Sequence, residues 1–416
     1  MLKKITQCRV CGNPNLRTCI DIGDQYLSSI FPENLNYHND LKKLPLEIAQ
    51  CMKTEEGHCG SLQLTHEIDI TDMYQHYPYT SSSNTAMQKI LEDVATSGIH
   101  LGHLRDQDVI LDIGCNDGTL LRNFESKNYQ LVGIDPAQNV ETKVNAKSFT
   151  RVKDFFTAKN YEKVTPKKAK LVFSVAMFYH LGDPVSFVKD IADILDDEGV
   201  AIVQMAYLPA MIKTNMYDNI VHEHVGYYGT QHMKWIFEQA GLELFDVLLN
   251  DVYGGSFRIF AKKKGQKYLP ATDRLKQNLQ EELEWGIFSA KTYDDFMTRI
   301  KKTKIDLLDL CKKIQQEGKN IWVYGASTKG NTILQFCGLG SKEITAAADS
   351  NPFKFNKYLI GSDIPIKNED EMRKASPDYL LSLPYSFTSN FLKREEPLIQ
   401  KGTKFIVPLP EVKVLP

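Results

Sequence analysis

Residues 217–228, YDNIVHEHVGYY, gather groups that can carry protons at one place in the chain. Two histidines flank a glutamate, and histidine titrates near neutral pH, so it can act as a general base in the cell. The HEH spacing differs from that of a zinc-binding helix, in which two histidines share one helical face. Residues two positions apart lie on the same side of an extended chain, so we expect His222 and His224 to point the same way from a strand or loop. The alternative is a polar turn whose histidines only satisfy backbone groups.

The framework that must hold these groups is a long, balanced chain. It has 416 residues, 25% of them charged, and a net charge of −2. This length predicts two or three domains, and the near-neutral charge argues against a nucleic-acid partner. We find no apolar run long enough to span a bilayer, and the start MLKKITQCRV lacks the apolar core of a signal peptide. The sequence therefore predicts a cytoplasmic protein with no membrane partner.

Cysteines cluster near the start of the chain. In a reducing cytosol, paired cysteines favour metal binding or plain burial over disulfides. Cys8 and Cys11 form a CxxC pair, and Cys51 with Cys59 offers a second, wider pair. We expect these four thiols to bind one structural zinc ion, because a closed four-ligand site leaves no position for catalysis. His58 or Cys19 could replace one ligand, and metal-free thiols are the alternative.

A hydroxyl-rich segment follows this module. It contains Tyr74, Tyr77, Tyr79, Ser81 and Ser82, and it precedes an amphipathic helix expected at residues 84–98. The segment could pack on a neighbouring domain, or it could form one wall of a ligand pocket.

The pattern DVILDIGCNDGTLLRNF predicts a nucleotide-binding unit. An apolar strand at residues 109–113 leads into a glycine loop, Gly114 to Gly118, and then into a helix expected near Thr119. A second strand, YQLVGID, ends at Asp135, where a carboxylate could accept hydrogen bonds from ribose hydroxyls. The loop does not read GxGxxG, which weakens a dinucleotide interpretation.

This arrangement resembles the class I S-adenosylmethionine methyltransferases. Asn116 replaces the middle glycine of their first motif, and asparagine also visits left-handed backbone conformations. In the resemblance Asp135 holds the ribose, Asp154 and Phe155 border the adenine, and the strand before His180 ends beside the methyl donor. The implied cofactor-binding residues are Asp112, Gly114, Asn116, Gly118, Asp135, Asp154 and Phe155.

The rest of the chain predicts a helical connector and a second nucleotide-binding unit. Residues 272–317 have the pattern of two amphipathic helices. After them, strand IWVYGAS, helix TKGNTILQF and strand ITAAADS, which ends at Asp349, repeat the order of a Rossmann half. The glycine pair in VYGGSFRIF predicts a bulge or a close approach, and Arg258 is expected to face solvent or, alternatively, a phosphate.

The predicted fold is therefore α/β in four parts. They are a zinc-binding module at residues 1–70, a methyltransferase core at 71–268, a helical connector at 269–318 and a Rossmann-like domain at 319–416. Three domains can bury substantial surface within one chain, which is compatible with a monomer.

Over its whole length the chain resembles the S-adenosylmethionine-dependent nucleotide-sugar C-methyltransferases of deoxysugar biosynthesis. The resemblance rests on CGSLQL, YPYTSS, the methyltransferase core, HEH, NDVYGGSFRIFAKK and IWVYGASTKGNTIL, in that order. It implies that His224 removes the C-3 proton of a nucleotide-linked 4-keto sugar. It also implies that Glu223 contacts the sugar or shuttles protons, and that His180 with Tyr79 or Tyr77 donates to the keto oxygen. The implied substrate-binding residues are His222, Ser327, Lys329, Gly330 and Asn331.

One position departs from this family. Its members carry tyrosine immediately before HEH, and this chain has Val221. Tyr217, Tyr227 or Tyr228 could take over that role, or the sugar and the methylated carbon could differ. Two other functions stay open from the residues, namely an O- or N-methyltransferase and a nucleotide-binding scaffold without activity.

Overall fold

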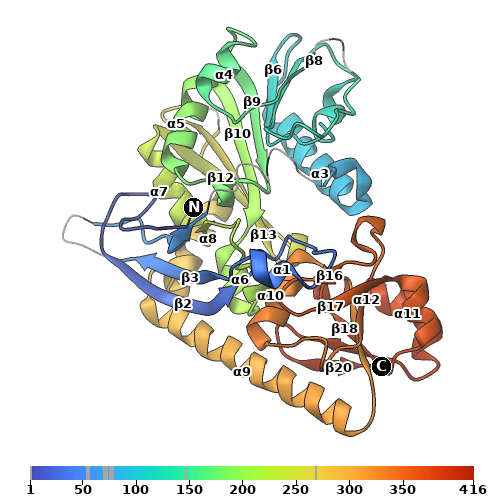
Figure 1. The fold of residues 1–416 in the computed structure, drawn as a ribbon. Helices are drawn as coiled ribbons and strands as arrows, with labels where there is room; N and C mark the ends of the chain where they lie inside the picture. Colours follow the sequence, from blue (N-terminus) through green and yellow to red (C-terminus); the bar gives the residue numbers. More distant parts are fainter. Residues whose placement is uncertain are drawn as a thin grey trace.

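The fold, described from a computed structural model, contains three sheet-based parts joined by two helices (Figure 1). The structure describes residues 2–52, 57–68, 74, 79–145, 147, 149–267 and 269–416. Among these residues, no helix is both long and apolar enough to cross a membrane. The expected boundaries after residues 70, 268 and 318 stay predictions.

The first large sheet has seven strands in the order β12-β13-β10-β9-β6-β7-β8. Its strands are β6 (Val109–Ile113), β7 (Gln130–Ile134), β8 (Phe149–Val152), β9 (Ala169–Val175), β10 (Leu195–Ala206), β12 (Leu242–Asn250) and β13 (Ser256–Lys263). All neighbours run parallel except β13, which is antiparallel to both β10 and β12. The strand order reverses between β6 and β9, and ligands bind at the carboxyl ends of strands at such a point.

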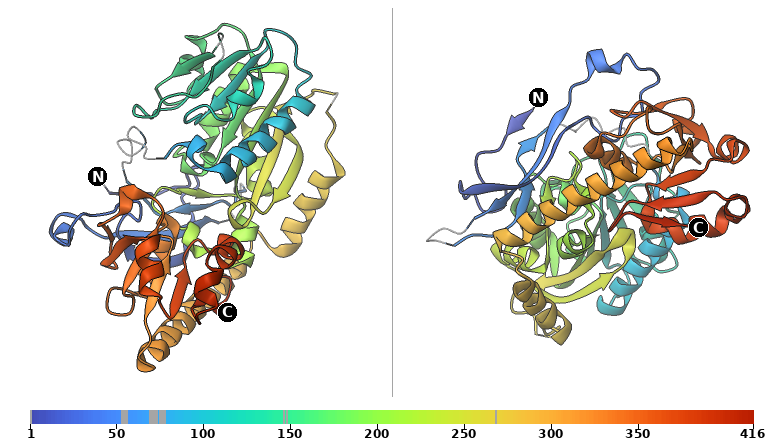
Figure 2. Two further views of the ribbon diagram at one scale, coloured as in Figure 1. Left: turned by 90° about the vertical axis from the view of Figure 1, so that its right-hand side faces the viewer. Right: turned by 90° about the horizontal axis from the view of Figure 1, so that it is seen from below.

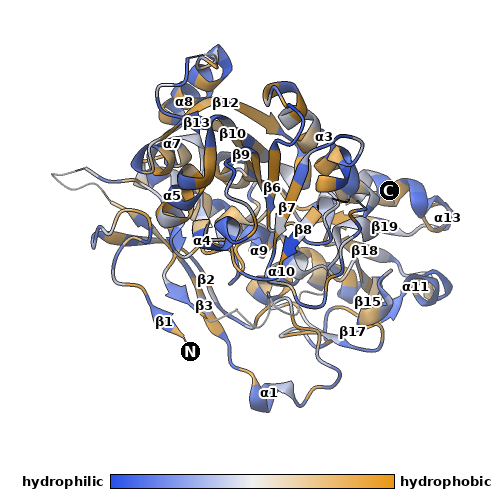
Figure 3. Ribbon diagram, turned by 90° about the horizontal axis from the view of Figure 1, so that it is seen from above, coloured by the Kyte–Doolittle hydropathy of each residue, from blue (hydrophilic) through white to orange (hydrophobic). Residues whose placement is uncertain are grey.

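Helices cover both faces of this sheet, which explains its continuous apolar strands. Side chains of β6 alternate between two cores. Ile110 packs with α3 (Thr85–Leu101), whereas Leu111 packs with α5 (Pro184–Ile194) and α7 (Thr230–Gln239). Figure 3 shows the apolar strands at the centre and helices with one polar side. The helix expected at 84–98 is confirmed as α3, and the Asn84 side chain caps it by accepting from Ala86 N at 3.0 Å.

The helix expected near Thr119 is not formed. Only a 3₁₀ turn, η2 (Leu121–Phe124), follows the glycine loop. The Asp117 side chain accepts hydrogen bonds from the Thr119 N–H at 3.3 Å and from its hydroxyl at 2.6 Å. Because these local bonds satisfy groups that would start a helix, the chain stays irregular here.

The N-terminal part is a four-stranded antiparallel sheet in the order β11-β4-β3-β2. Its strands are β2 (Leu16–Gln25), β3 (Leu44–Cys51), β4 (Leu62–Leu64) and β11 (Gly226–Tyr227), with α1 (Tyr37–Asp40) after β2 and a separate pair β1 (Lys3–Lys4) and β5 (His66–Glu67). The edge strand β11 comes from the stretch that carries HEH. The first two sheets are therefore tied together beside these histidines.

The two expected connector helices are confirmed as α8 (Asp273–Trp285) and α9 (Ala290–Gln316). Helix α9 lies along both the N-terminal sheet and the C-terminal part (Figure 2). Its buried side chains, among them Phe296, Ile300 and Leu307, share one apolar core with both. The connector is thus a core element of the molecule.

The C-terminal part is a second seven-stranded sheet, with order β16-β17-β15-β14-β18-β19-β20. Its elements are β14 (Ile321–Tyr324), α10 (Thr328–Cys337), β15 (Ala346–Asp349), β16 (Tyr358–Leu359), β17 (Ile364–Asn368), α11 (Glu369–Ala375), β18 (Tyr379–Ser382), α12 (Thr388–Arg394), α13 (Glu396–Ile399), β19 (Lys404–Val407) and β20 (Lys413–Leu415). The five inner strands are parallel and the edge strands β16 and β20 antiparallel. This confirms the predicted Rossmann-like domain. The remaining elements are η1 (Ser81–Ser83), α4 (Ala158–Glu162), η3 (Phe178–His180), α6 (Leu208–Lys213), η4 (Tyr217–Asn219), η5 (Val252–Gly254), η6 (Pro352–Lys354) and η7 (Tyr385–Phe387).

The expectation for Arg258 is wrong, because it is buried in β13 with 2% of its surface exposed. Its guanidinium donates to Gln204 Oε1 at 2.8 Å and pairs with Asp93 of α3 at 2.5 Å. Arg258 therefore ties helix α3 to the sheet. The neighbouring glycines serve close approach, since a Cβ on Gly255 would lie 2.5 Å from Ala210 Cβ.

Candidate functional site

A central cavity of about 590 Å³ opens at the carboxyl ends of β6, β7 and β9, and the C-terminal domain forms its opposite wall. One wall includes Asp112, Gly114, Asn116, Asp135, Phe155 and Phe156. A second includes Tyr74, Tyr79, Ser81, Tyr179, His180, Asp218 and His224. The third includes Tyr253, Ser327, Lys329, Pro384, Tyr385 and Phe387. The cavity is thus shared between the two large sheets.

The glycine loop forms the floor of the cavity. Gly114 and Asn116 adopt positive φ angles of +75° and +51°, so the expectation that Asn116 would take the left-handed conformation is confirmed. A Cβ on Gly114 would approach Met177 Cγ to 3.2 Å. Both Asp135 carboxylate oxygens accept backbone N–H groups, from Asn116 and Ala137, at 2.8 Å each. This fixes the carboxylate at the place where a ribose would lie.

These residues fit S-adenosylmethionine chemically. The cavity combines a glycine cradle, the fixed Asp135 carboxylate and an aromatic side at Phe155 and Phe156 that suits an adenine. Asp112 lies at the end of β6, and burial raises the pKa of its carboxyl well above its ordinary value, as does the nearby Asp135. A cationic amino group would lower the cost of ionising this buried carboxyl.

Two expected cofactor residues have other roles in the described structure. Gly118 (φ +81°) is not among the lining residues, and its missing Cβ leaves room for Val144 Cγ2, which would lie at 2.4 Å. Asp154 is also outside the lining and accepts from Asn160 Nδ2 at 3.0 Å.

Hydrogen bonds hold the segment that contains Tyr79 against the glycine loop. The Asn116 side chain donates to the Tyr79 carbonyl at 3.0 Å and accepts from Ser81 N–H at 2.8 Å. Asp117 accepts from Ser82 N–H at 3.0 Å. Tyr74, Tyr79 and Ser81 all line the cavity, so this segment forms a pocket wall. Tyr77 lies outside the described residues.

Two imidazole rings stack inside the cavity. His180 and His224 have ring centroids 5.4 Å apart at 24°, with Tyr74 stacked on His180 and Tyr179 4.2 Å from the His224 ring. Burial lowers the pKa of His180 to about 3. Burial, with smaller contributions from His180 and Lys329, holds the pKa of His224 well below its ordinary value. Both rings are therefore neutral at cellular pH.

The tautomer of His224 follows from its backbone partner. Nδ1 lies 2.9 Å from the Asn219 carbonyl oxygen. Since a carbonyl only accepts, Nδ1 carries the proton and Nε2 keeps its lone pair. This is the form that a general base requires.

His222 and Glu223 do not accompany His224 into the cavity. The two histidines were expected on the same side, but residues 221–224 form a turn closed by a bond from His224 N–H to the Val221 carbonyl at 3.0 Å. The alternation of an extended strand therefore does not apply. His222 Nε2 lies 3.2 Å from the Leu44 carbonyl, and Glu223 is buried with its side chain bonded to Ser29 of the N-terminal part.

The C-terminal wall contains only two of the four residues expected there. Ser327 caps α10 by accepting from Gly330 N–H at 3.0 Å, and both Ser327 and Lys329 line the cavity. A Cβ on Gly330 would lie 2.3 Å from Leu383 Cβ, and Asn331 donates to the Ile360 carbonyl at 3.1 Å. These two residues therefore serve the packing of the domain.

Sequence reasoning missed several residues of the cavity, in particular Tyr179, Asp218, Tyr253 and Tyr385. Asp218 and Tyr179 lie close to HEH and to His180 in the sequence, which was a usable signal. No sequence signal pointed to Tyr253 and Tyr385, because they reach the cavity from turns that lie far from these motifs in the chain. The expected substitutes for the family tyrosine at Val221 lie elsewhere: Tyr217 contacts Cys337 Sγ at 3.8 Å, and Tyr227 and Tyr228 are buried outside the described lining.

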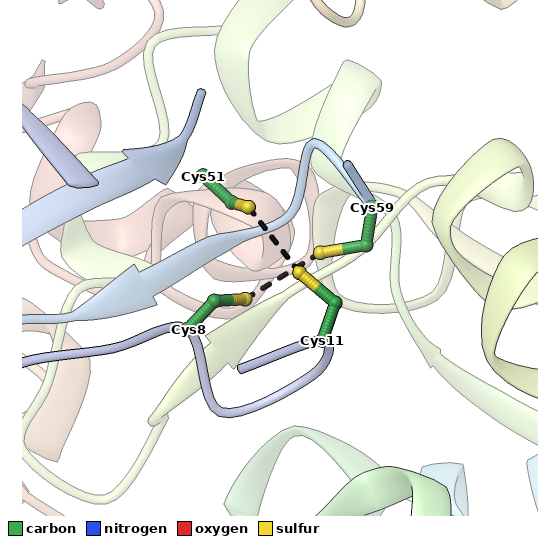
Figure 4. Close-up of side chains that lie close together, drawn as sticks. All are labelled: Cys8, Cys11, Cys51 and Cys59. Atoms are coloured by element: carbon green, nitrogen blue, oxygen red, sulfur yellow. Dashed lines mark hydrogen bonds between the residues drawn. The ribbon is translucent and has the colours of Figure 1, made fainter. Parts of the chain in front are cut away.

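The four expected zinc ligands converge in the N-terminal part (Figure 4). The Sγ atoms of Cys8, Cys11, Cys51 and Cys59 lie within 4.8 Å of one another, with Cys8–Cys59 and Cys11–Cys51 each at 3.5 Å. A tetrahedral ion with Zn–S bonds of ~2.3 Å needs sulfurs about 3.8 Å apart, so the set fits zinc. Neither Cys19 nor His58, the alternative ligands, belongs to this cluster: Cys19 contacts the Ile48 carbonyl, and the His58 ring packs on Phe288.

The fold and the cavity together define a class I S-adenosylmethionine-dependent methyltransferase. Models of known families match the chain in three consecutive parts. They are a zinc-binding domain at residues 8–74, a methyltransferase domain at 84–247 and a C-methyltransferase C-terminal domain at 251–410. The chain is therefore similar to C-methyltransferases in three consecutive parts, and it is a C-methyltransferase that uses S-adenosylmethionine as methyl donor.

Individual relatives agree over different lengths. C-methyltransferase NovU of Streptomyces niveus is 28% identical over 417 residues, covering 100% of this chain and 98% of the relative. A tRNA U34 carboxymethyltransferase of Campylobacter jejuni is 26% identical over 151 residues, or 34% of this chain and 52% of that protein. The solved structure of magnesium protoporphyrin IX methyltransferase from Synechocystis with bound SAH is 14% identical over 44% of this chain and 88% of its own, with a TM-score of 0.34. A likeness at that level adds nothing to the assignment.

Proposed function

We propose that the protein transfers a methyl group to C-3 of a nucleotide-linked 4-keto sugar, as expected for deoxysugar biosynthesis. A methyl group can be placed on carbon only if that carbon becomes nucleophilic. A C–H bond next to a carbonyl is acidic enough, because the charge left behind spreads onto the keto oxygen. The observation that carries the proposal is the neutral His224, which lines the same cavity as the glycine loop and whose bond through Nδ1–H leaves the lone pair on Nε2.

In this proposal His224 Nε2 takes the C-3 proton, and the electron pair of the C–H bond moves to give an enolate. S-adenosylmethionine supplies an electrophilic methyl group, which the enolate carbon accepts. His180 and Tyr79 donate hydrogen bonds to the keto oxygen as it gains charge. A donor aimed at such an oxygen supplies roughly 3 kcal/mol. His180 suits this task because a neutral imidazole keeps one N–H.

The substrate's nucleotide part is assigned to the C-terminal wall. Ser327 and Lys329 lie at the N-terminal end of α10, whose free N–H groups favour an anion. We assign the diphosphate to them. For the cofactor we assign Asp112, Gly114, Asn116, Asp135 and Phe155. The buried Glu223 and His222 are assigned to holding the HEH turn against the N-terminal part, and Zn²⁺ to the four cysteines as a structural ion.

The test uses mass spectrometry of sugar nucleotides. Purified protein is incubated with S-adenosylmethionine and a panel of dTDP- and UDP-linked 4-keto-6-deoxyhexoses, and a donor-free sample is kept in heavy water. We expect a product heavier by one methyl group in place of hydrogen, and deuterium at C-3 in the donor-free sample. His224→Ala should abolish both, whereas His100→Ala, an exposed histidine on α3, should retain both.

Each departure has a meaning. Methylation without deuterium uptake by any substrate would favour an O- or N-methyltransferase, which needs no enolate. Deuterium uptake that persists in His224→Ala would show that another group is the base.

A further inference from the structure

The turn that precedes the HEH stretch is held by the C-terminal domain through three consecutive side chains. The Tyr217 ring of η4 packs against Phe336 with centroids 5.0 Å apart. Asp218 accepts a hydrogen bond from the Tyr385 hydroxyl at 2.9 Å. Asn219 accepts one through Oδ1 from Lys329 Nζ. All three residues of this turn are buried.

The contact between Lys329 and Asn219 involves a residue that also binds His224. Asn219 joins two groups: its side chain accepts from Lys329, and its carbonyl accepts from Nδ1 of His224. Its own N–H is bound to the Met216 carbonyl at 3.1 Å. A residue anchored at both its N–H and its side chain has little freedom to turn its carbonyl away from the imidazole.

Lys329 is an unusual anchor because its amine lines the internal cavity, where the Asp218 carboxylate acts on it. Burial lowers the pKa of its amine, and the Asp218 carboxylate opposes that effect. The Tyr253 ring lies 5.9 Å from Nζ. An ammonium has three donors, so the bond to Asn219 leaves others that can point into the cavity.

We propose that Lys329 and Asn219 are positioning residues through which the C-terminal domain fixes the tautomer and direction of His224. The chain of contacts runs from Lys329 Nζ to Asn219 Oδ1, and from the Asn219 carbonyl to His224 Nδ1. His224 belongs to the methyltransferase domain, but the orientation of its ring is fixed by the domain that forms the opposite wall of the cavity. The inference rests on the proposed role of His224 as the base.

The charged and titratable groups that face His224 are His180 and Tyr179 from the strand end and Lys329 from α10, with Asp218 beside Lys329. Removing the ammonium removes a positive charge that opposes protonation of His224. Lys329→Met should therefore move the acidic limb of the pH profile to higher pH. Asn219→Ala changes no charge but weakens the carbonyl bond that favours the protonated ring, so it should move that limb to lower pH.

The first experiment measures donor-free deuterium uptake at C-3, with the dTDP- and UDP-linked 4-keto-6-deoxyhexoses, as a function of sugar concentration and pH. For Asn219→Ala we expect kcat to fall about 10-fold with KM changed less than 2-fold. For Lys329→Met we expect a similar fall with a raised KM, since the amine is also assigned to the diphosphate. The double variant should lose little more than either single one, because both act through one chain of contacts. Lys342→Met, an exposed lysine of the same domain, is the matched control and should behave like the wild type.

A second experiment needs no substrate. In protein with ¹⁵N-labelled histidine, the His224 signals, assigned by their loss in His224→Ala, report which ring nitrogen is protonated. The wild type should show the Nδ1–H form, and Asn219→Ala should show a mixture of both forms.

The two experiments separate the inference from the function on which it rests. A tautomer change in Asn219→Ala without deuterium uptake in the wild type would support the positioning device and reject the substrate class. An unchanged tautomer together with an unchanged kcat in Asn219→Ala would overturn the positioning device, even with methylation confirmed. An Nε2–H form in the wild type would overturn it as well.

Discussion

The loops that follow β6 and β14, one in each large sheet, have the same pattern of hydrogen bonds but different surroundings. In the first, Gly114 N–H bonds to the Ile134 carbonyl at 2.8 Å, and Asp135 accepts the N–H groups of Asn116 and Ala137. In the second, Gly325 N–H bonds to the Ala348 carbonyl at 2.8 Å. There Asp349 accepts the N–H groups of Ala326 and Asn351, at 2.9 and 2.8 Å.

The difference lies in what else each carboxylate meets. Asp135 lines the central cavity, and its nearest cation, Arg151, is 3.8 Å away. Asp349 is outside the described lining and pairs with Lys354 Nζ at 2.9 Å, which also donates to the Ala326 carbonyl at 2.8 Å. A lysine thus occupies the carboxylate that corresponds to Asp135. The same backbone geometry places one carboxylate at the cavity and the other in an internal ion pair.

The largest expected effect separates these two carboxylates. Asp135→Ala should weaken S-adenosylmethionine binding about 100-fold, because bonds to a charged acceptor contribute roughly 1.5–3 kcal/mol each. Asp349→Ala should leave that affinity within a factor of two. Isothermal titration calorimetry measures both, and equal losses in the two variants would remove the distinction between the halves.

The second expected effect is acid sensitivity. The last of the ten histidines is His232, so the sequence from residue 319 onward, which forms the second large sheet, has none. Burial lowers the pKa of His232 to about 4, compared with 6.5 for an ordinary histidine. The unfolded chain then binds more protons below pH 6.5, and stability falls as the pH drops from there toward 4. At pH 5 this histidine should cost about 2 kcal/mol.

His232→Gln tests this sign. The variant loses bonds at any pH, but its difference in unfolding free energy between pH 7 and pH 5 should be about 2 kcal/mol smaller than in the wild type. Urea unfolding at the two pH values measures it. A difference that does not shrink would mean that other groups cause the acid sensitivity.

The third expected effect concerns Gly114 and Gly325, which occupy corresponding positions in the two loops. Gly114→Ala and Gly325→Ala both place a Cβ on a residue of positive φ, which costs about 1–2 kcal/mol. A Cβ at position 325 would also come within 2.5 Å of Pro384. We expect both variants to melt at lower temperature, but only Gly114→Ala to lose cofactor affinity. Loss of affinity in both would show that the second loop also supports the cofactor.

The smallest effect is expected for Lys354→Met. Its salt bridge to Asp349 is largely buried, but the carboxylate keeps the N–H groups of Ala326 and Asn351 when the lysine is removed, so we expect a loss of about 1 kcal/mol. Thermal unfolding should show this small loss, with unchanged methyl transfer. If Lys354→Met instead gained affinity for adenosine, measured by calorimetry, the closed carboxylate would be shown to be a blocked ribose site.

The sequence predicted most of the framework because its signals were local. Strand 109–113, the helix capped by Asn84 and the two connector helices follow from periodicity and capping, and the four cysteines from their spacing. The errors arose where backbone or side-chain groups formed bonds that the sequence spacing does not encode. The Asp117 side chain bonds to Thr119 where a helix was expected. A bond from His224 N–H to the Val221 carbonyl forms a turn that keeps His222 out of the cavity, and Arg258 pairs with Asp93 of helix α3. Tyr253 and Tyr385 reach the cavity through tertiary packing alone.

The pairing of β11 with β4 limits how this enzyme could be rebuilt from parts. Gly226 and Tyr227, which follow HEH after one intervening residue, complete the sheet of the zinc-binding part by pairing with Gln63 and Leu62. Exchanging that part for one from a relative would replace half of this strand pair. A working chimera would therefore need its crossover points chosen so that both partners come from one parent, although they lie more than 160 positions apart in the chain.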